Sequence, residues 1–69
     1  MNKLSIRLKE LRKEHCLSQK DLAIILKTTN SSICDWEKGR TEPSVEFIIS
    51  ICRYFDVSAD YLLGLDNIS

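Results

Sequence analysis

Three polar side chains with short stems, Asn30, Ser31 and Asp35, lie close together in the chain. If this stretch is helical, Asn30 and Ser31 begin it and Asp35 lies one turn beyond Ser31, so the three share one face. The large apolar residues of the stretch, Ile33 and Trp36, are three positions apart and form the side that packs inward. An amide, a hydroxyl and a carboxylate can donate to or accept from the edges of nucleic-acid bases. The pattern therefore predicts a polar helix face that can approach base edges closely.

Capping signals bound this stretch and a second helix before it. Thr29 is of the residue type that caps helix N-termini, and Gly39 is the left-handed stop expected at the other end. An earlier helix opens at Ser18, whose hydroxyl can accept from the backbone amide of Asp21 while the Asp21 carboxylate reaches back. The apolar rhythm of that helix breaks at Lys27. Two short capped helices joined by a tight turn form the geometry of a helix-turn-helix.

Three more helices are expected around this pair, and no sheet, which makes the fold class all-α. Apolar residues at helical spacing predict a first helix over residues 4–14. Ser44 and Ser58 are expected to cap a fourth and a fifth helix, with Asp56 in the turn between them because Asp tolerates a left-handed backbone. Gly64 closes the last helix. The residues expected to face inward from the first and fourth helices include Leu4, Leu8, Leu11, Val45, Ile48, Ile51, Cys52 and Phe55.

Length and composition indicate one small domain. At 69 residues, the chain can bury only about 60% of its unfolded surface, so it has room for one core and little stability to spare. We expect a single domain over residues 1–69, with its core at about 3–64 and a short tail at 65–69. The sequence has no run of 18 apolar residues and no signal-peptide pattern at its N-terminus, which predicts a cytoplasmic protein with no membrane partner.

The reactive side chains do not form an enzyme site. Cys16, Cys34 and Cys52 are odd in number, widely spaced and without a CxxC pair, which argues against a disulfide framework or a zinc site. His15 and Cys16 are adjacent, so on a helix their side chains diverge by about 100° and do not form a nucleophile–base pair. We expect no enzyme activity, no metal and no cofactor. One hypothesis is that oxidation of Cys34 weakens nucleic-acid binding. The alternative is that the thiols are buried and inert.

Charge is unevenly distributed, although the chain is formally neutral. Residues 1–40 hold nine Lys or Arg against five Asp or Glu, whereas residues 41–69 hold one against five. A basic face for a polyanion and an acidic end directed elsewhere would produce this asymmetry. The alternative is the ordinary variation of surface charge among small domains, so charge supports nucleic-acid binding without establishing it.

Residues 17–43, LSQKDLAIILKTTNSSICDWEKGRTEP, resemble the DNA-binding domain of the phage repressor and Cro type, the XRE family of bacterial and phage regulators. The flanking segments IRLKELRKEHCLSQ and EPSVEFIISICRYFDVSADYLLG extend the resemblance over about sixty residues. It implies a compact five-helix lambda-repressor-like domain with the helix-turn-helix at the second and third helices. It also implies that Ile6 faces inward and that Arg12 pairs with Glu37.

The resemblance assigns roles to individual residues. Asn30 and Ser31, in the opening turn of the recognition helix, are expected to contact bases, and Asn30 is the first candidate because its amide can form two hydrogen bonds with adenine. The alternative is that both are ordinary helix-start residues. The residues expected to contact the DNA backbone are Gln19, Thr29, Ser32, Lys38, Arg40 and Thr41. Arg7 and Lys9 are weaker candidates, better explained as a solvated face.

Two positions depart from the family pattern. Lys27 stands where the family favours glycine, which costs about 1 kcal/mol if the left-handed conformation is retained. Asp35 stands on the groove-facing side, where many relatives carry Arg, Lys or Gln. Its carboxylate either accepts from a cytosine amino group or only pairs with Lys38 or Arg40 on the helix surface.

The function implied is that of a small transcriptional regulator, expected to be a repressor, which binds double-stranded DNA as a homodimer on an inverted-repeat operator. No small-molecule ligand is expected, because one domain leaves no room for an inducer site. The alternative is an antitoxin or a protein-interaction module with the same fold, supported by Ile24, Ile25 and Phe47 if their side chains are exposed. Relatives usually carry charged residues at the two isoleucine positions, so Ile24 and Ile25 either widen the core or mark contact with another protein. The residues expected at the dimer interface are Phe47, Tyr54, Tyr61, Leu65 and Ile68.

Overall fold

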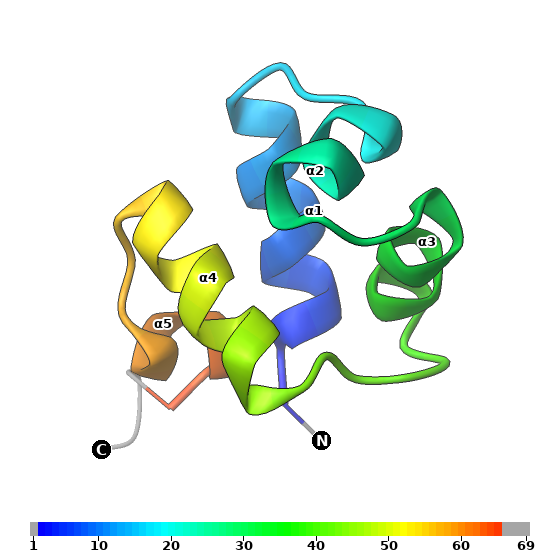
Figure 1. Ribbon diagram of the computed structural model, residues 1–69. Helices are drawn as coiled ribbons and strands as arrows, with labels where there is room; N and C mark the ends of the chain where they lie inside the picture. The colour runs from blue at the N-terminus through cyan, green and yellow to red at the C-terminus, as the bar shows by residue number, and fades with distance from the viewer. Residues whose placement is uncertain (1, 66–69) are drawn as a thin grey trace.

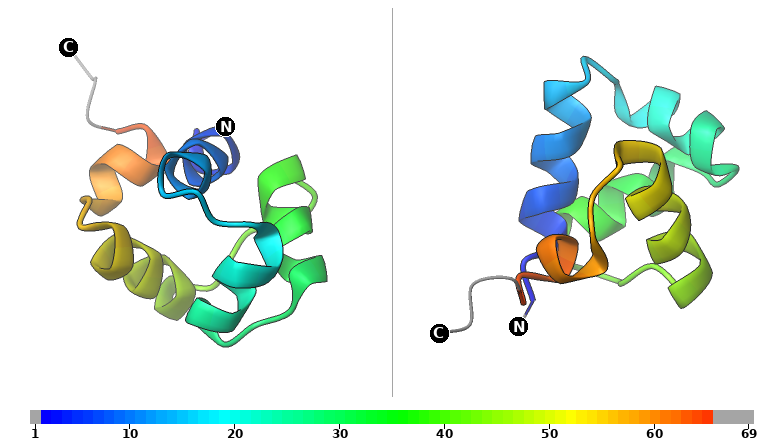
Figure 2. Two further views of the ribbon diagram at one scale, coloured as in Figure 1. Left: turned by 90° about the horizontal axis from the view of Figure 1, so that it is seen from above. Right: turned by 90° about the vertical axis from the view of Figure 1, so that its left-hand side faces the viewer.

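The computed structural model describes residues 2–65, and within this range the chain forms five α-helices and no strand, as expected (Figure 1). The helices are α1 (Leu4–Glu14), α2 (Gln19–Leu26), α3 (Asn30–Lys38), α4 (Val45–Phe55) and α5 (Ala59–Leu63). α1 packs against α3 and α5, and α2 packs against α3 and α4. In the view from above, α2 and α3 lie to one side of α1, and α4 and α5 lie to the other (Figure 2). Within the described part of the chain, no helix has the length and apolar character to cross a membrane.

Each helix after α1 begins at a side chain that caps it. The hydroxyls of Ser18, Thr29, Ser44 and Ser58 accept hydrogen bonds from the backbone amides three residues later. Each bond satisfies an amide that has no partner within its own helix. At Ser18 the bond is reciprocal, because the Asp21 carboxylate accepts from the Ser18 amide at 3.0 Å and completes the expected capping box. The helix starts predicted from these residues are therefore confirmed.

Among the described residues, three other than glycine adopt the left-handed backbone at helix ends. Lys27, Asp56 and Cys16 have φ angles of 60°, 57° and 56°. The conformation considered at Lys27 and Asp56 is confirmed, whereas nothing in the sequence indicated it at Cys16. The amides of Cys16 and Leu17 bond back to carbonyl oxygens in the last turn of α1, which reverses the chain and requires this backbone conformation at Cys16.

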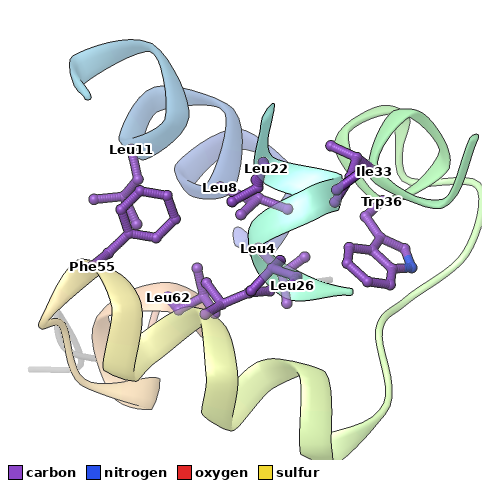
Figure 3. Packing of buried hydrophobic residues seen from close by; sticks show 11 residues of the cluster. Leu4, Leu8, Leu11, Leu22, Leu26, Ile33, Trp36, Phe55 and Leu62 are labelled. Atoms are coloured by element: carbon purple, nitrogen blue, oxygen red, sulfur yellow. The ribbon is translucent and has the colours of Figure 1, made fainter. Parts of the chain in front are cut away.

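One apolar core joins all five helices (Figure 3). Trp36 of α3 points back into this core and is 5% exposed, which confirms its assignment as a core residue. Since the core residues come from every helix, no helix pair buries its apolar side alone, and α3 is held by contacts with both α1 and α2. The buried hydrophobic residues are Leu4, Leu8, Leu11, Leu22, Ala23, Leu26, Ile33, Trp36, Ile51, Phe55 and Leu62.

Two residues expected to face inward are exposed instead. Ile6 is 60% exposed because it lies two residues, about 200° around the helix, from both Leu4 and Leu8 of the buried side. Val45 is 71% exposed, and its distance of six residues from Ile51 places it about 120° away around α4. Both predictions were wrong, because each side chain projects from the side of its helix that faces away from the core.

Candidate nucleic-acid interface

α3 turns its apolar side inward and its polar side outward. Ile33 is fully buried, whereas Asn30 and Ser31 are exposed and Asp35 is partly exposed. Figure 1 shows α3 at the edge of the molecule, directly after the turn that follows α2. The two side chains expected to contact bases therefore lie in an exposed opening turn, free of the core.

Two hydroxyls meet at the start of α3. The Thr29 hydroxyl oxygen accepts from the Ser32 amide at 3.1 Å, and the hydroxyl donates to Ser32 Oγ at 3.0 Å. A hydroxyl has one proton to donate, so the Thr29 proton is already used. Thr29 and Ser32 were both expected to contact the DNA backbone, and Ser32 is the residue whose hydroxyl can still donate to a phosphate oxygen.

A buried ion pair joins α3 to α1, as predicted. Arg12 Nε donates to Glu37 Oε2 at 2.6 Å, and Arg12 Nη2 donates to Glu37 Oε1 at 3.1 Å. A third donor, Arg12 Nη1, bonds to the carbonyl oxygen of Leu17 at 2.8 Å. The hydrogen bond with Glu37 raises the pKa of Arg12 despite the opposing effect of burial. The guanidinium thus ties α1, the loop before α2, and α3 together.

Gln19 is held by the same carboxylate. Its Nε2 donates to Glu37 Oε1 at 3.2 Å, and the residue is half-buried at the first position of α2. Free backbone amides lie at this end of a helix and favour an anion such as phosphate. The two residues are 18 positions apart, so no helical periodicity in the sequence could have indicated their contact.

Charged and polar side chains lie in the last turns of α3 and directly after it. Arg40 lies 3.6 Å from the Asp35 carboxylate, with side-chain exposures of 65% and 37%. Asp35 therefore forms the surface ion pair with Arg40 that was considered for it as the alternative to base contact. Lys38 and Thr41 are exposed beside this pair. A pair this open to solvent contributes less than about 1 kcal/mol to stability.

Arg7 contacts Tyr61, and nothing in the sequence indicated this contact. The guanidinium carbon of Arg7 lies 4.4 Å from the centre of the Tyr61 ring, and Nη1 donates to the Tyr61 carbonyl oxygen. Arg7 is therefore packed between α1 and α5 and does not lie on the purely solvated face expected for it. The residues are 54 positions apart, and only the fold brings them together.

The residues expected at a dimer interface differ in exposure. Tyr54 and Leu65 are 45% and 50% exposed, whereas Tyr61 is half-buried beneath Arg7. Phe47 was also expected at the interface, but it is half-buried, and the centre of its ring lies 5.1 Å from that of Trp36, because Phe47 lies one turn before the buried Ile51 on α4. Ile68 lies outside the described residues.

The other candidate interaction surface is on α2. Ile24 is 68% exposed, whereas Ile25 packs partly against the core. Ile24 is therefore exposed as the interaction-module alternative requires, whereas Ile25 adds to the core.

The cysteines remain separate thiols. Cys16 is exposed, and Cys34 and Cys52 are half-buried. Burial raises the pKa of the Cys52 thiol, which lowers its reactivity. Over residues 2–65, no three side chains of metal-ligating type come together.

Sequence comparisons place this chain among regulators. A family model described as a helix-turn-helix domain matches residues 5–68. The HTH-type transcriptional regulator ImmR of Bacillus subtilis is 33% identical over 66 residues, covering 96% of this chain and 52% of ImmR. Antitoxin PezA of Streptococcus pneumoniae is 37% identical over 60 residues, covering 87% of this chain and 38% of PezA. The chain spans about half the length of the first of these relatives.

Solved structures share the same arrangement of helices. A transcriptional regulator from Listeria innocua superposes with a TM-score of 0.91 at 28% identity, covering all of this chain and 64% of that one. The P22 c2 repressor, solved in complex with a synthetic operator, superposes with a TM-score of 0.84 at 30% identity. That match covers 91% of this chain and 96% of the repressor chain.

Proposed function

This chain belongs to the helix-turn-helix domain family of phage repressor and Cro-type regulators, and from that premise we propose that it binds specific sequences in double-stranded DNA through α3. The observation that carries the proposal is the exposed opening turn of α3, with Asn30 and Ser31 outward and Ile33 buried behind them. In a helix-turn-helix, this end of the second helix enters the major groove. The P22 c2 repressor, which has the same helix arrangement, is solved with an operator.

Base readout is assigned to the first turn of α3. The Asn30 amide offers both a donor and an acceptor, which match the N7 and amino groups of adenine. Ser31 offers a hydroxyl that suits several base edges. Asp35 discriminates in a different way, because its carboxylate accepts only from a donor such as the cytosine amino group and is repelled by phosphates.

Backbone contacts are assigned to the two helix starts and to the segment after α3. Gln19 and Ser32 supply neutral donors, and Thr29 holds Ser32 in place. Lys38 is the last residue of α3, Arg40 and Thr41 follow it, and all three are exposed. Such contacts set the register of the protein on DNA without reading sequence. Each phosphate neutralised by Lys or Arg steepens the dependence of affinity on salt by about 0.9 on a log-log scale.

A homodimer on an inverted repeat completes the proposal. One recognition helix reads too few base pairs for a selective complex, and two copies spaced by about 34 Å would meet successive major grooves on one face of the DNA. Apolar side chains exposed in this domain support an interface on α4 and at the end of α5, namely Ile49, Tyr54 and Leu65. Repression by occlusion of a promoter is the regulatory role proposed.

Selection of bound duplexes from a random pool tests the proposal. The expected product is an inverted repeat with half-sites about one helical turn apart, bound by two chains. Salt titration of the selected duplex should then give a slope that reflects several phosphate contacts. A pool that shows no enrichment at low salt would contradict DNA binding, and enrichment of a single unrepeated site would contradict the dimer.

A second candidate function is that of an antitoxin. Its support is the similarity to antitoxin PezA and the 68% exposure of Ile24 on α2. Pull-down from a native host extract should then recover a protein partner that Ile24→Lys fails to bind. If the wild type and Ile24→Lys recover the same amount of the partner, α2 is not the binding surface.

A further inference from the structure

Glu37 contacts more than its ion-pair partner. Its carboxylate accepts two hydrogen bonds from Arg12 of α1 and one from Gln19, the first residue of α2. Glu37 itself belongs to α3, so one carboxylate links the recognition helix to the start of the helix before it. The Glu37 side chain is 3% exposed, and it cannot turn away without breaking the ion pair.

This partner determines the orientation of the Gln19 amide. The Glu37 carboxylate, paired with a guanidinium, offers only acceptor oxygens. Gln19 must therefore present its NH2 group to Glu37, and its carbonyl oxygen lies on the other side of the amide. One N–H is used at 3.2 Å, and the second N–H stays available. A phosphate is also an acceptor, so that second N–H is the group with which Gln19 can bind the DNA backbone.

We propose that Glu37 is a positioning residue for DNA binding, which holds the Gln19 amide in the orientation that donates to a phosphate. This inference rests on the proposed DNA-binding function. A side chain already fixed before binding loses less rotamer freedom when the complex forms. Because the holding carboxylate is on α3, the phosphate contact at α2 and the base contacts of α3 keep a constant geometry relative to each other.

A double-mutant cycle on the selected operator duplex tests the proposal. Gln19→Ala should weaken binding by about tenfold, the typical effect of losing a hydrogen bond to a charged group. Glu37→Gln should weaken binding by a similar factor, because its amide no longer compels Gln19 to present an N–H. The double variant should bind no more weakly than Gln19→Ala alone. Losses that multiply in the double variant would overturn the positioning role.

Arg12→Lys is the matched control for stability. It breaks the two-pronged contact with Glu37 but leaves the carboxylate and the Gln19 side chain in place. Binding by this variant, measured well below its melting temperature, should still fall about tenfold on adding Gln19→Ala. If Gln19→Ala has no effect in the Arg12→Lys background, the ion pair and not Glu37 orients Gln19, and the inference is wrong.

NMR of the wild-type protein gives a test that does not depend on whether Glu37→Gln folds. In the free protein, the Nε2 proton of Gln19 that is bonded to Glu37 should exchange with water more slowly than its partner proton, and addition of the operator duplex should shift and protect the partner proton. If the two protons exchange with water at equal rates in the free protein, or if the duplex leaves the partner proton unshifted, the inference is wrong. A wild type that binds no duplex would overturn the proposed function itself, which separates the two failures.

Discussion

Arg12 of α1 and Glu37 of α3 are 25 positions apart, yet Arg12 Nε lies 2.6 Å from Glu37 Oε2 in a space almost closed to solvent. The two side chains are 10% and 3% exposed. A charged side chain that is shielded from solvent in this way is stabilised by its ion-pair partner, because water cannot reach it to solvate the charge. The ion pair therefore holds the recognition helix against its support at a defined position.

Arg12→Ala should lower the free energy of unfolding by about 3 kcal/mol or more, because it leaves the Glu37 carboxylate buried and unpaired. Urea unfolding followed by circular dichroism gives the value. Lys13→Ala, at an exposed neighbouring position, should change it by less than about 0.5 kcal/mol. Equal effects at the two positions would show that the pair contributes little.

Lys27→Gly should stabilise the protein by about 1 kcal/mol, because glycine has no Cβ to be strained at a φ of 60°. Lys9→Gly, at an exposed position in the interior of α1, removes the same charge and should instead destabilise by about 1 kcal/mol. Thermal unfolding of the two variants gives opposite shifts from wild type. A loss of stability at both positions would contradict strain at Lys27.

Asn30→Ala and Arg40→Ala should affect DNA binding differently. Asn30→Ala should relax the base preference at one symmetric pair of operator positions by about 1 to 3 kcal/mol. Arg40→Ala should weaken binding to all duplexes alike and reduce the salt slope by less than about 1 per chain, because the Asp35 carboxylate competes with phosphate for the Arg40 guanidinium. Binding to single-base operator variants over a range of salt separates the two. A uniform loss from Asn30→Ala would place that side chain on the backbone.

Asp35→Asn should increase the affinity for DNA of unrelated sequence. The substitution removes a negative charge from the groove-facing side and frees Arg40, now 3.6 Å from the carboxylate, to pair with a phosphate. The salt slope should become steeper as the affinity rises. In an Arg40→Ala background the slope should no longer steepen, and a slope that still does would assign the gain to another cation.

Asp21 should make the protein sensitive to acid. The hydrogen bond from the Ser18 backbone amide, together with the Ser18 side chain, holds the pKa of Asp21 below its usual value of 3.8. The unfolded chain therefore binds the proton first, so the stabilising effect is complete above about pH 4 and is lost as the pH falls through the lower folded value. Asp21→Asn keeps an oxygen for the Ser18 amide but does not titrate.

Melting temperatures measured at a series of pH values from neutral down to about pH 3 compare Asp21→Asn with wild type. The wild type should lose more stability over the acidic part of this range. Parallel curves for the two proteins would show that the capping carboxylate contributes nothing to the acid transition.

Local features of the chain were predicted well because they depend on neighbours in sequence. Ser18, Thr29, Ser44 and Ser58 each cap the helix expected of them, since a cap involves only the next three residues. Exposure was predicted less well, since it depends on which helices meet. Phe47 was expected at a dimer interface, but its ring packs against that of Trp36.

The sequence by itself determined the helices, their ends and the polar face of α3, because hydrogen bonds and apolar spacing within a few residues decide these features. Only the tertiary structure decided which side chains from distant segments meet. Glu37 receives Arg12 and Gln19 from two other helices, and Arg7 covers Tyr61 across 54 positions. Such contacts follow from packing five helices around one core, in which the position of each helix is set by the burial of all the others.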